Sequence, residues 1–180
     1  MRRALLNLAL YEAGWLACVL GAANGRPWMG ACTGLFLLIV HITFCRDRQK
    51  EIVTVVLIAL MGTLVDSVQA FSGVFVFLSG YWTPWVVPFW ITVMWLQFAT
   101  LFHFALSWLS GRYLLAAVLG AVGGPSAYLA GERLGAAVFS LSYRYSITFL
   151  AAVWFFVLPV CVVIAERFRP VKRGYRFETT

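Results

Sequence analysis

The sequence predicts an all-α protein, a polytopic bundle that crosses a membrane six times. Of its 180 residues, 62% are hydrophobic and 12% are charged, and the mean hydropathy is +0.87. Soluble domains carry roughly 25% charged residues, so a water-soluble fold is excluded. Helices are favoured over a barrel because the apolar segments are long and lack the alternation of membrane-spanning strands. No polar linker divides residues 1–180, which are expected to form one domain.

Six apolar segments are long enough to cross a hydrocarbon core about 30 Å thick as helices. We expect the spans at residues 4–22, 27–45, 52–74, 85–109, 113–131 and 145–166. Pro27 suits the first turn of a helix. The first segment, which follows Arg2 and Arg3, also resembles a signal peptide. Because Glu12 interrupts its apolar run, we expect it to be retained as a span.

Basic residues gather on one side of this predicted topology. With a cytoplasmic N-terminus, only Arg26, Arg133 and Arg144 of the 14 lysines and arginines lie outside. This bias places both termini in the cytoplasm, with a short basic tail over about residues 167–180. The net charge of +7 then reflects topology, and because the basic residues are spread over successive loops, no nucleic acid is expected as a partner. Membrane lipids are the expected partners.

No motif indicates a metal, a cofactor or nucleotide chemistry. The four cysteines share no C-x-x-C spacing and lie within or at the ends of the predicted spans, so small apolar packing residues are the expected role. They are Cys18, Cys32, Cys45 and Cys161. The sequence also lacks the phosphate-binding loop, the H-E-x-x-H pair and the G-x-S-x-G elbow.

Polar side chains inside the spans are the candidate functional residues. Asp66 is the main one, because a charge facing lipid costs several kcal/mol. Spacings of three or four residues put two sets on common helix faces: Gly62, Asp66, Gln69 and Gly73 on the third span, and Gln97, Thr100, His103 and Ser107 on the fourth. We therefore predict a polar seam between these two helices. The expected ligand-binding residues are Asp66, Gln69, Gln97, His103 and Glu12.

Each of these residues also has a purely structural interpretation. Asp66 could fix helix register through a hydrogen bond to Gln97 or to the backbone. A lone histidine such as His103 is more often bonded to a carboxylate or serine than catalytic. Glu12 could pair with Arg112 or with His103 across the bundle.

The fifth span is rich in glycine. Gly123, Gly124 and Pro125 predict a kink, because proline removes a helical hydrogen bond. The small residues that permit close helix packing or a break in the helix are Gly120, Gly124, Pro125, Gly131 and Gly135. Broken helices can bind substrate in transporters, but packing is the favoured interpretation.

One set of residues, spread over nearly the whole chain, forms a recognisable pattern: Gly14, Trp15, Ala17, Cys18, Gly21, Ala22, Gly25, Arg26, Pro27, Trp28, Phe98, His103, the segment 120–128, Gly131, Arg133, Leu134 and Gly135. In these residues the chain resembles a bacterial inner-membrane family catalogued as domain of unknown function 2878. This resemblance implies a multi-pass topology in the bacterial inner membrane and favours a lipid as substrate. It implies no activity, because none is established for the family.

Three functions fit these observations. The first is a binding or transport component for a small apolar molecule or lipid, using the polar seam and the fifth span. The second is an intramembrane lipid-modifying enzyme with His103 as acid or base, oriented by Glu12 or Asp66. The third is a scaffold that binds partner membrane proteins or forms a homo-oligomer. The first is favoured because an enzyme would need a nucleophile, metal or cofactor, and the two histidines alone provide few catalytic groups.

Overall fold

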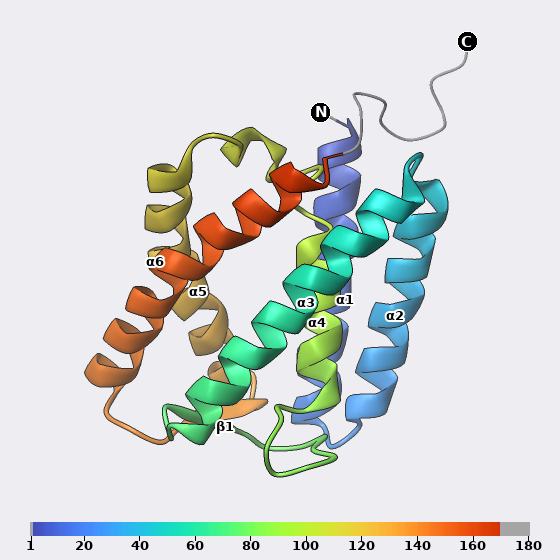
Figure 1. Ribbon diagram of the computed structural model, residues 1–180. Helices are drawn as coiled ribbons and strands as arrows, with labels where there is room; N and C mark the ends of the chain where they lie inside the picture. The colour runs from blue at the N-terminus through green and yellow to red at the C-terminus, as the bar shows by residue number, and fades with distance from the viewer. Residues whose placement is uncertain (1, 170–180) are drawn as a thin grey trace.

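The computed structural model describes residues 2–169 and is a bundle of helices (Figure 1). Its α-helices are α1 (Arg2–Ala23), α2 (Pro27–Phe44), α3 (Arg48–Phe71), α4 (Phe89–Ala99), α5 (Tyr113–Arg133) and α6 (Tyr143–Arg167). Five are long and apolar enough to cross a membrane, and α4 is shorter. The predicted all-helical architecture is thus confirmed, with five rather than six helices of residues 2–169 long and apolar enough to cross a membrane. The predicted tail lies outside the described residues beyond Arg169.

The fourth predicted span, residues 85–109, is only partly α-helical. After α4 the chain forms turns over residues 100–106 and then the 3₁₀ helix η1 (Ser107–Leu109). A helical spacing of three or four residues therefore has no meaning beyond Ala99. The prediction that His103 and Ser107 continue the helix face of Gln97 is wrong.

A buried asparagine on α1 explains why α4 ends where it does. The Asn7 side chain donates to Thr100 Oγ1 at 3.1 Å, and its Oδ1 accepts from the backbone N–H of Ala105 at 3.3 Å. Thr100 Oγ1 also donates to the carbonyl of Gln97 at 2.7 Å. These bonds satisfy backbone groups that the end of a helix leaves without partners.

Two short strands, which the sequence analysis did not predict, join distant parts of the chain. β1 (Phe75–Phe77) pairs antiparallel with β2 (Ala137–Phe139), with Phe75 opposite Phe139 and Phe77 opposite Ala137. This pair of strands lies at the end of the bundle opposite the N-terminus (Figure 1). Non-helical backbone is tolerated there because the ladder pairs its polar groups.

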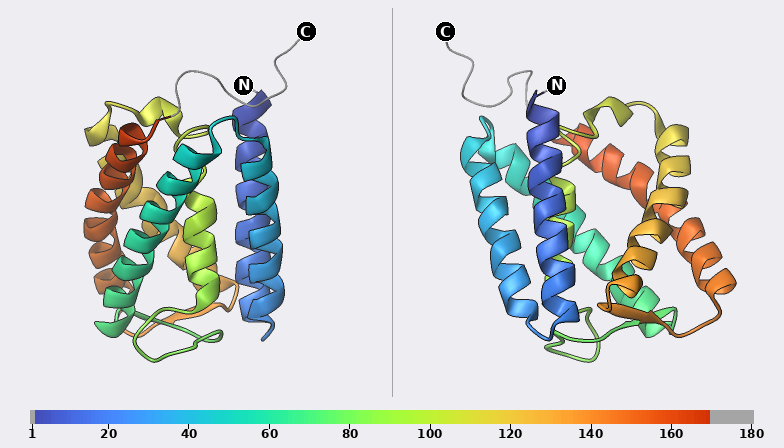
Figure 2. Two further views of the ribbon diagram at one scale, coloured as in Figure 1. Left: turned by 45° about the vertical axis from the view of Figure 1, so that its right-hand side comes forward. Right: turned by 180° about the vertical axis from the view of Figure 1, so that it is seen from behind.

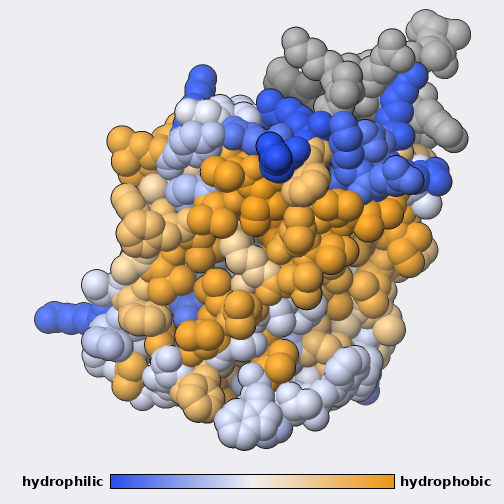
Figure 3. Space-filling model, in the orientation of Figure 1, coloured by the Kyte–Doolittle hydropathy of each residue, from blue (hydrophilic) through white to orange (hydrophobic). Residues whose placement is uncertain are grey.

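The helices form two flanking pairs with α3 and α4 between them (Figure 2). α1 packs on α2 and α4, α5 packs mainly on α6, and α3 contacts both α4 and α6. On the face shown in Figure 3, apolar side chains form a broad belt between a strongly hydrophilic end and a mixed polar end. This distribution is typical of a protein surrounded by acyl chains.

Helix α5 is assigned as one helix from Tyr113 to Arg133, with Pro125 in its interior. Gly120 and Pro125 are buried, and Gly120 lies against the backbone of Trp154 on α6. The kink at Gly123, Gly124 and Pro125 stays a prediction.

Candidate functional site: an aromatic cavity

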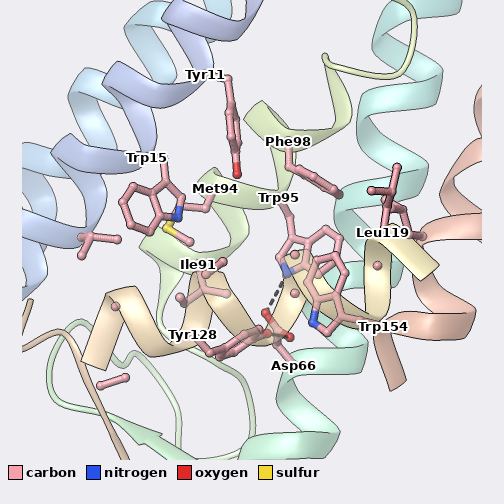
Figure 4. A pocket seen from close by; sticks show the side chains of 18 of the residues that line it. Tyr11, Trp15, Asp66, Ile91, Met94, Trp95, Phe98, Leu119, Tyr128 and Trp154 are labelled. Carbon is pink, nitrogen blue, oxygen red and sulfur yellow. Dashed lines mark hydrogen bonds between the residues drawn. The ribbon is translucent and has the colours of Figure 1, made fainter. Parts of the chain in front are cut away.

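A cavity of about 410 Å³ lies between the two helix pairs (Figure 4). Small-molecule sites commonly measure about 300–1,000 Å³. Its walls are almost entirely apolar and come from five helices: Tyr11, Trp15 and Val19 of α1; Asp66 of α3; Trp90, Ile91, Met94, Trp95 and Phe98 of α4; Leu119, Gly120, Gly123, Gly124, Ala127, Tyr128 and Gly131 of α5; Trp154 and Leu158 of α6.

Irregular segments also line the cavity at its two ends. Phe77, Ala136 and Ala137, in and beside the strand pair, line one end. Leu106 and Trp108, in and before η1, line the other. The early end of α4 and the unpredicted strands therefore both shape the cavity.

Asp66 is the hydrogen-bonding centre of the cavity wall. Its Oδ2 accepts from Trp95 Nε1 at 2.7 Å, and its Oδ1 accepts from the Tyr128 hydroxyl and from Gln69 Nε2, the latter at 3.2 Å. Asp66 and Gln69 are buried. Since these bonds join α3 to α4 and α5, the carboxyl group holds aromatic side chains in place around the cavity.

Stacked indoles form part of the same wall. The Trp95 and Trp154 rings lie 5.3 Å apart between centroids and are inclined by 8°. Two glycines make room for them: a Cβ on Gly62 would lie 1.9 Å from Trp95, and a Cβ on Gly124 would lie 2.1 Å from Trp154. Any side chain at either glycine would displace an indole.

Other glycines leave the cavity itself open. A Cβ added to Gly123 or Gly131 would have no atom within 4 Å, and both residues line the cavity. Gly135 follows α5 and has a φ of +85°, a turn conformation that favours glycine. The glycines of the fifth span thus divide between the helix contact, the cavity and a turn.

Three hydrogen-bond donors in the cavity wall lack partners within residues 2–169. The buried Nε1 of Trp154 has none. The Tyr11 hydroxyl and the Trp15 indole nitrogen also make no hydrogen bond there. Tyr11 points its hydroxyl into the space beside Trp95 and Phe98 (Figure 4). The cavity therefore offers donors to an occupant.

Gln97 lies in a different helix interface from Asp66. Its side chain fills a slot between α1 and α2, where a Cβ on Gly14 or Gly34 would lie within 1.6 or 2.2 Å of its amide. The amide nitrogen lies 4.0 Å from Cys18 Sγ, and Oε1 has no hydrogen-bond partner in the described part of the chain. The predicted seam is not continuous, because Trp95 rather than Gln97 reaches Asp66 from α4.

His103 belongs to a second polar cluster. Its Nδ1 lies 2.6 Å from Glu51 Oε2, and its Nε2 donates to the Ala165 carbonyl at 3.0 Å. The other oxygen, Glu51 Oε1, lies 2.9 Å from His41 Nε2. Sequence reasoning missed Glu51 because it lies between the predicted spans 27–45 and 52–74, at the end of a run of charged residues, although its side chain is only 1% exposed.

Glu12 lies apart from the other predicted ligand-binding residues. It is exposed, although it is near the middle of α1, and it does not line the cavity. Within residues 2–169 it forms no ion pair or hydrogen bond, so neither Arg112 nor His103 is its partner.

Comparison with known proteins gives a family but no characterised relative. Neither the curated proteins nor the solved structures contain a match to this chain. The sequence profile of one family matches residues 4–160, as the resemblance predicted, and the chain belongs to that family, described as protein of unknown function (DUF2878).

Proposed function

We propose that this protein is a binding or transport component for a small apolar molecule or a lipid in the bacterial inner membrane. The observation that carries the proposal is the aromatic cavity between the two helix pairs. Its wall joins α1 to α5, which otherwise pack on different partners. An apolar occupant would gain about 25 cal/mol for each Å² of apolar surface that it removes from water.

The wall also indicates the polar character of the occupant. Asp66 is its one charged lining residue, and donors of the protein already use both carboxyl oxygens. No lysine or arginine lines the cavity, so an anionic head group would be buried without a counter-charge, which is costly. The unpartnered donors of Tyr11, Trp15 and Trp154 instead fit a neutral acceptor, such as an ester, ketone or hydroxyl oxygen.

The charge distribution supports a cytoplasmic location for both chain termini. The start of α1 and the end of α6 lie at the same end of the bundle (Figure 1). The basic residues expected at that end within the described chain are Arg2, Arg3, Arg46, Arg48, Lys50, Arg112, Arg167 and Arg169, against Arg26, Arg133 and Arg144 at the other. This excess fits the positive-inside rule.

The cavity can be filled without disturbing helix packing. In Gly123→Leu the new side chain enters open space, and glycine in a helix interior costs about 1 kcal/mol relative to alanine. Each ligand methylene that the new side chain excludes from the cavity removes about 0.8 kcal/mol of binding free energy. Excluding two of them therefore lowers the affinity about tenfold. Val122→Leu is the matched control, because Val122 is 64% exposed on the same helix and lies outside the cavity lining.

Binding is measured by quenching of tryptophan fluorescence in detergent, since five cavity residues are tryptophans. A dibrominated monoacylglycerol is the neutral probe, and the matching dibrominated fatty acid is the anionic one. We expect saturable quenching by the neutral probe in the wild type and in Val122→Leu, and about tenfold weaker binding in Gly123→Leu. Equal quenching in all three proteins would refute the cavity assignment, and tighter binding of the fatty acid would refute the neutral head group.

A further inference from the structure

Three potential metal ligands converge where α2 meets α3, away from the aromatic cavity. His41 and Cys45 are four residues apart, at the end of α2, and Glu51 lies in the first turn of α3. Nε2 of His41 lies 3.4 Å from Cys45 Sγ and 2.9 Å from Glu51 Oε1. All three residues are buried, and their ligand atoms lie within 4.8 Å of one another.

The two measured separations are close to those of a tetrahedral metal site. Zinc bonds of about 2.0–2.3 Å to nitrogen, oxygen and sulfur place neighbouring ligand atoms roughly 3.3–3.7 Å apart. The His41–Cys45 separation already falls in this range. The histidine and carboxylate must part by only a few tenths of an ångström, which a small side-chain rotation supplies.

His103 holds the carboxylate ligand in place. Its Nε2 faces a carbonyl oxygen, which can only accept, and its Nδ1 faces Glu51 Oε2. The carboxylate is therefore fixed through one oxygen, while the other faces His41 and Cys45. Hydrogen-bonding partners of this kind orient metal ligands, and their loss typically weakens metal affinity 10- to 100-fold.

We propose that His41, Cys45 and Glu51 bind one transition-metal ion, with Zn²⁺ as the best match, and that His103 is a positioning residue for Glu51. Imidazole, thiolate and carboxylate together suit a borderline-soft ion rather than Mg²⁺ or Ca²⁺. Two anionic ligands balance a divalent charge inside the bundle. The spacing of the cysteines in the sequence does not indicate a metal site, because the third ligand, Glu51, comes from the next helix and meets His41 and Cys45 only in the folded protein.

The three ligand residues lie beside an exposed corner of the chain. The corner between the helices, residues 46–50, is exposed or half-buried, and Asp47 caps α3 there by accepting from the N–H of Lys50. An ion entering at this corner would tie the end of α2 to the start of α3.

Cobalt titration of the full-length protein, purified in detergent without a histidine tag, tests the proposal. Co²⁺ is the probe because thiolate coordination gives a near-ultraviolet charge-transfer band. We expect one equivalent to bind with this band, and Zn²⁺ to displace it. Cys45→Ala should remove the band, and Glu51→Gln should weaken binding. His103→Asn should keep the band while lowering Co²⁺ affinity 10- to 100-fold.

Cys161→Ala is the matched control, since Cys161 is also buried but lies on α6. It should bind Co²⁺ as the wild type does. Circular dichroism spectra verify that each variant is folded. Absence of the band in the wild type, or its persistence in folded Cys45→Ala, would overturn the proposal. Cobalt binding does not depend on the aromatic cavity or on the acylglycerol assay. Either proposal can therefore be refuted without affecting the other.

Discussion

Replacing Asp66 tests whether one carboxyl group organises the cavity wall. In Asp66→Ala, the donors on Trp95, Tyr128 and Gln69 all lose their acceptor at once. In Asp66→Asn, one oxygen remains for Trp95. The Gln69 amide can then turn to present its Oε1, which has no partner among residues 2–169, to the new amide nitrogen. Alanine should therefore be much the worse substitution.

The expected loss of unfolding free energy follows from the number of hydrogen-bond donors that each substitution leaves without an acceptor. A buried donor left without a partner costs about 1–3 kcal/mol, whereas hydrogen bonds between membrane helices average about 0.6 kcal/mol in mutant cycles. Three donors give a loss of roughly 2–9 kcal/mol for Asp66→Ala. This is a large part of a typical stability of 5–15 kcal/mol. Asp66→Asn should lose about 1–3 kcal/mol, because it trades charge-assisted bonds for neutral ones.

Reversible unfolding in mixed micelles, followed by tryptophan fluorescence, measures these losses. Thr33→Ala is the control, because the Thr33 hydroxyl is exposed and bonds only within its own helix, to the carbonyl of Met29. It should change the free energy of unfolding by less than about 0.5 kcal/mol. If Asp66→Ala proves as stable as Thr33→Ala, the carboxyl group does not hold the wall together.

Two further substitutions test packing and helix termination. Gly124→Val should destabilise the protein by about 1–3 kcal/mol by forcing Trp154 aside, whereas Gly131→Val should be tolerated; equal melting temperatures would contradict this account. Asn7→Leu should loosen the turns after α4, because the amide bonded to Thr100 is lost. Hydrogen exchange should then accelerate over residues 100–106 but not in α2, and unchanged exchange there would show that Asn7 does not fix the turns.

The sequence predicted the helices that depend on hydropathy and missed the structure that depends on particular hydrogen bonds. Five long apolar helices lie close to their predicted positions. The end of α4 was missed because its cause, Asn7, is 93 residues from Thr100. The strands were missed because three-residue segments carry little periodicity and these pair across about 60 residues.

The polar residues show the same division. Burial of Asp66 was predicted from its depth in an apolar segment. Its partners Trp95 and Tyr128 were not predicted, because the sequence does not distinguish them from other aromatic residues of the spans. Helical spacing placed Gln97 and His103 in one row, whereas three-dimensional packing sends them to separate interfaces. The four-residue spacing of His41 and Cys45 was a usable local signal, but the third ligand lies across the turn.

The stacked rings of Trp95 and Trp154 give the protein a built-in optical reporter. At 5.3 Å and nearly parallel, the two indoles are close enough for their electronic transitions to couple. Because one ring belongs to α4 and the other to α6, sliding of either helix alters that coupling and hence the near-ultraviolet circular dichroism. Opening of the bundle at this level can therefore be followed in real time without any attached dye.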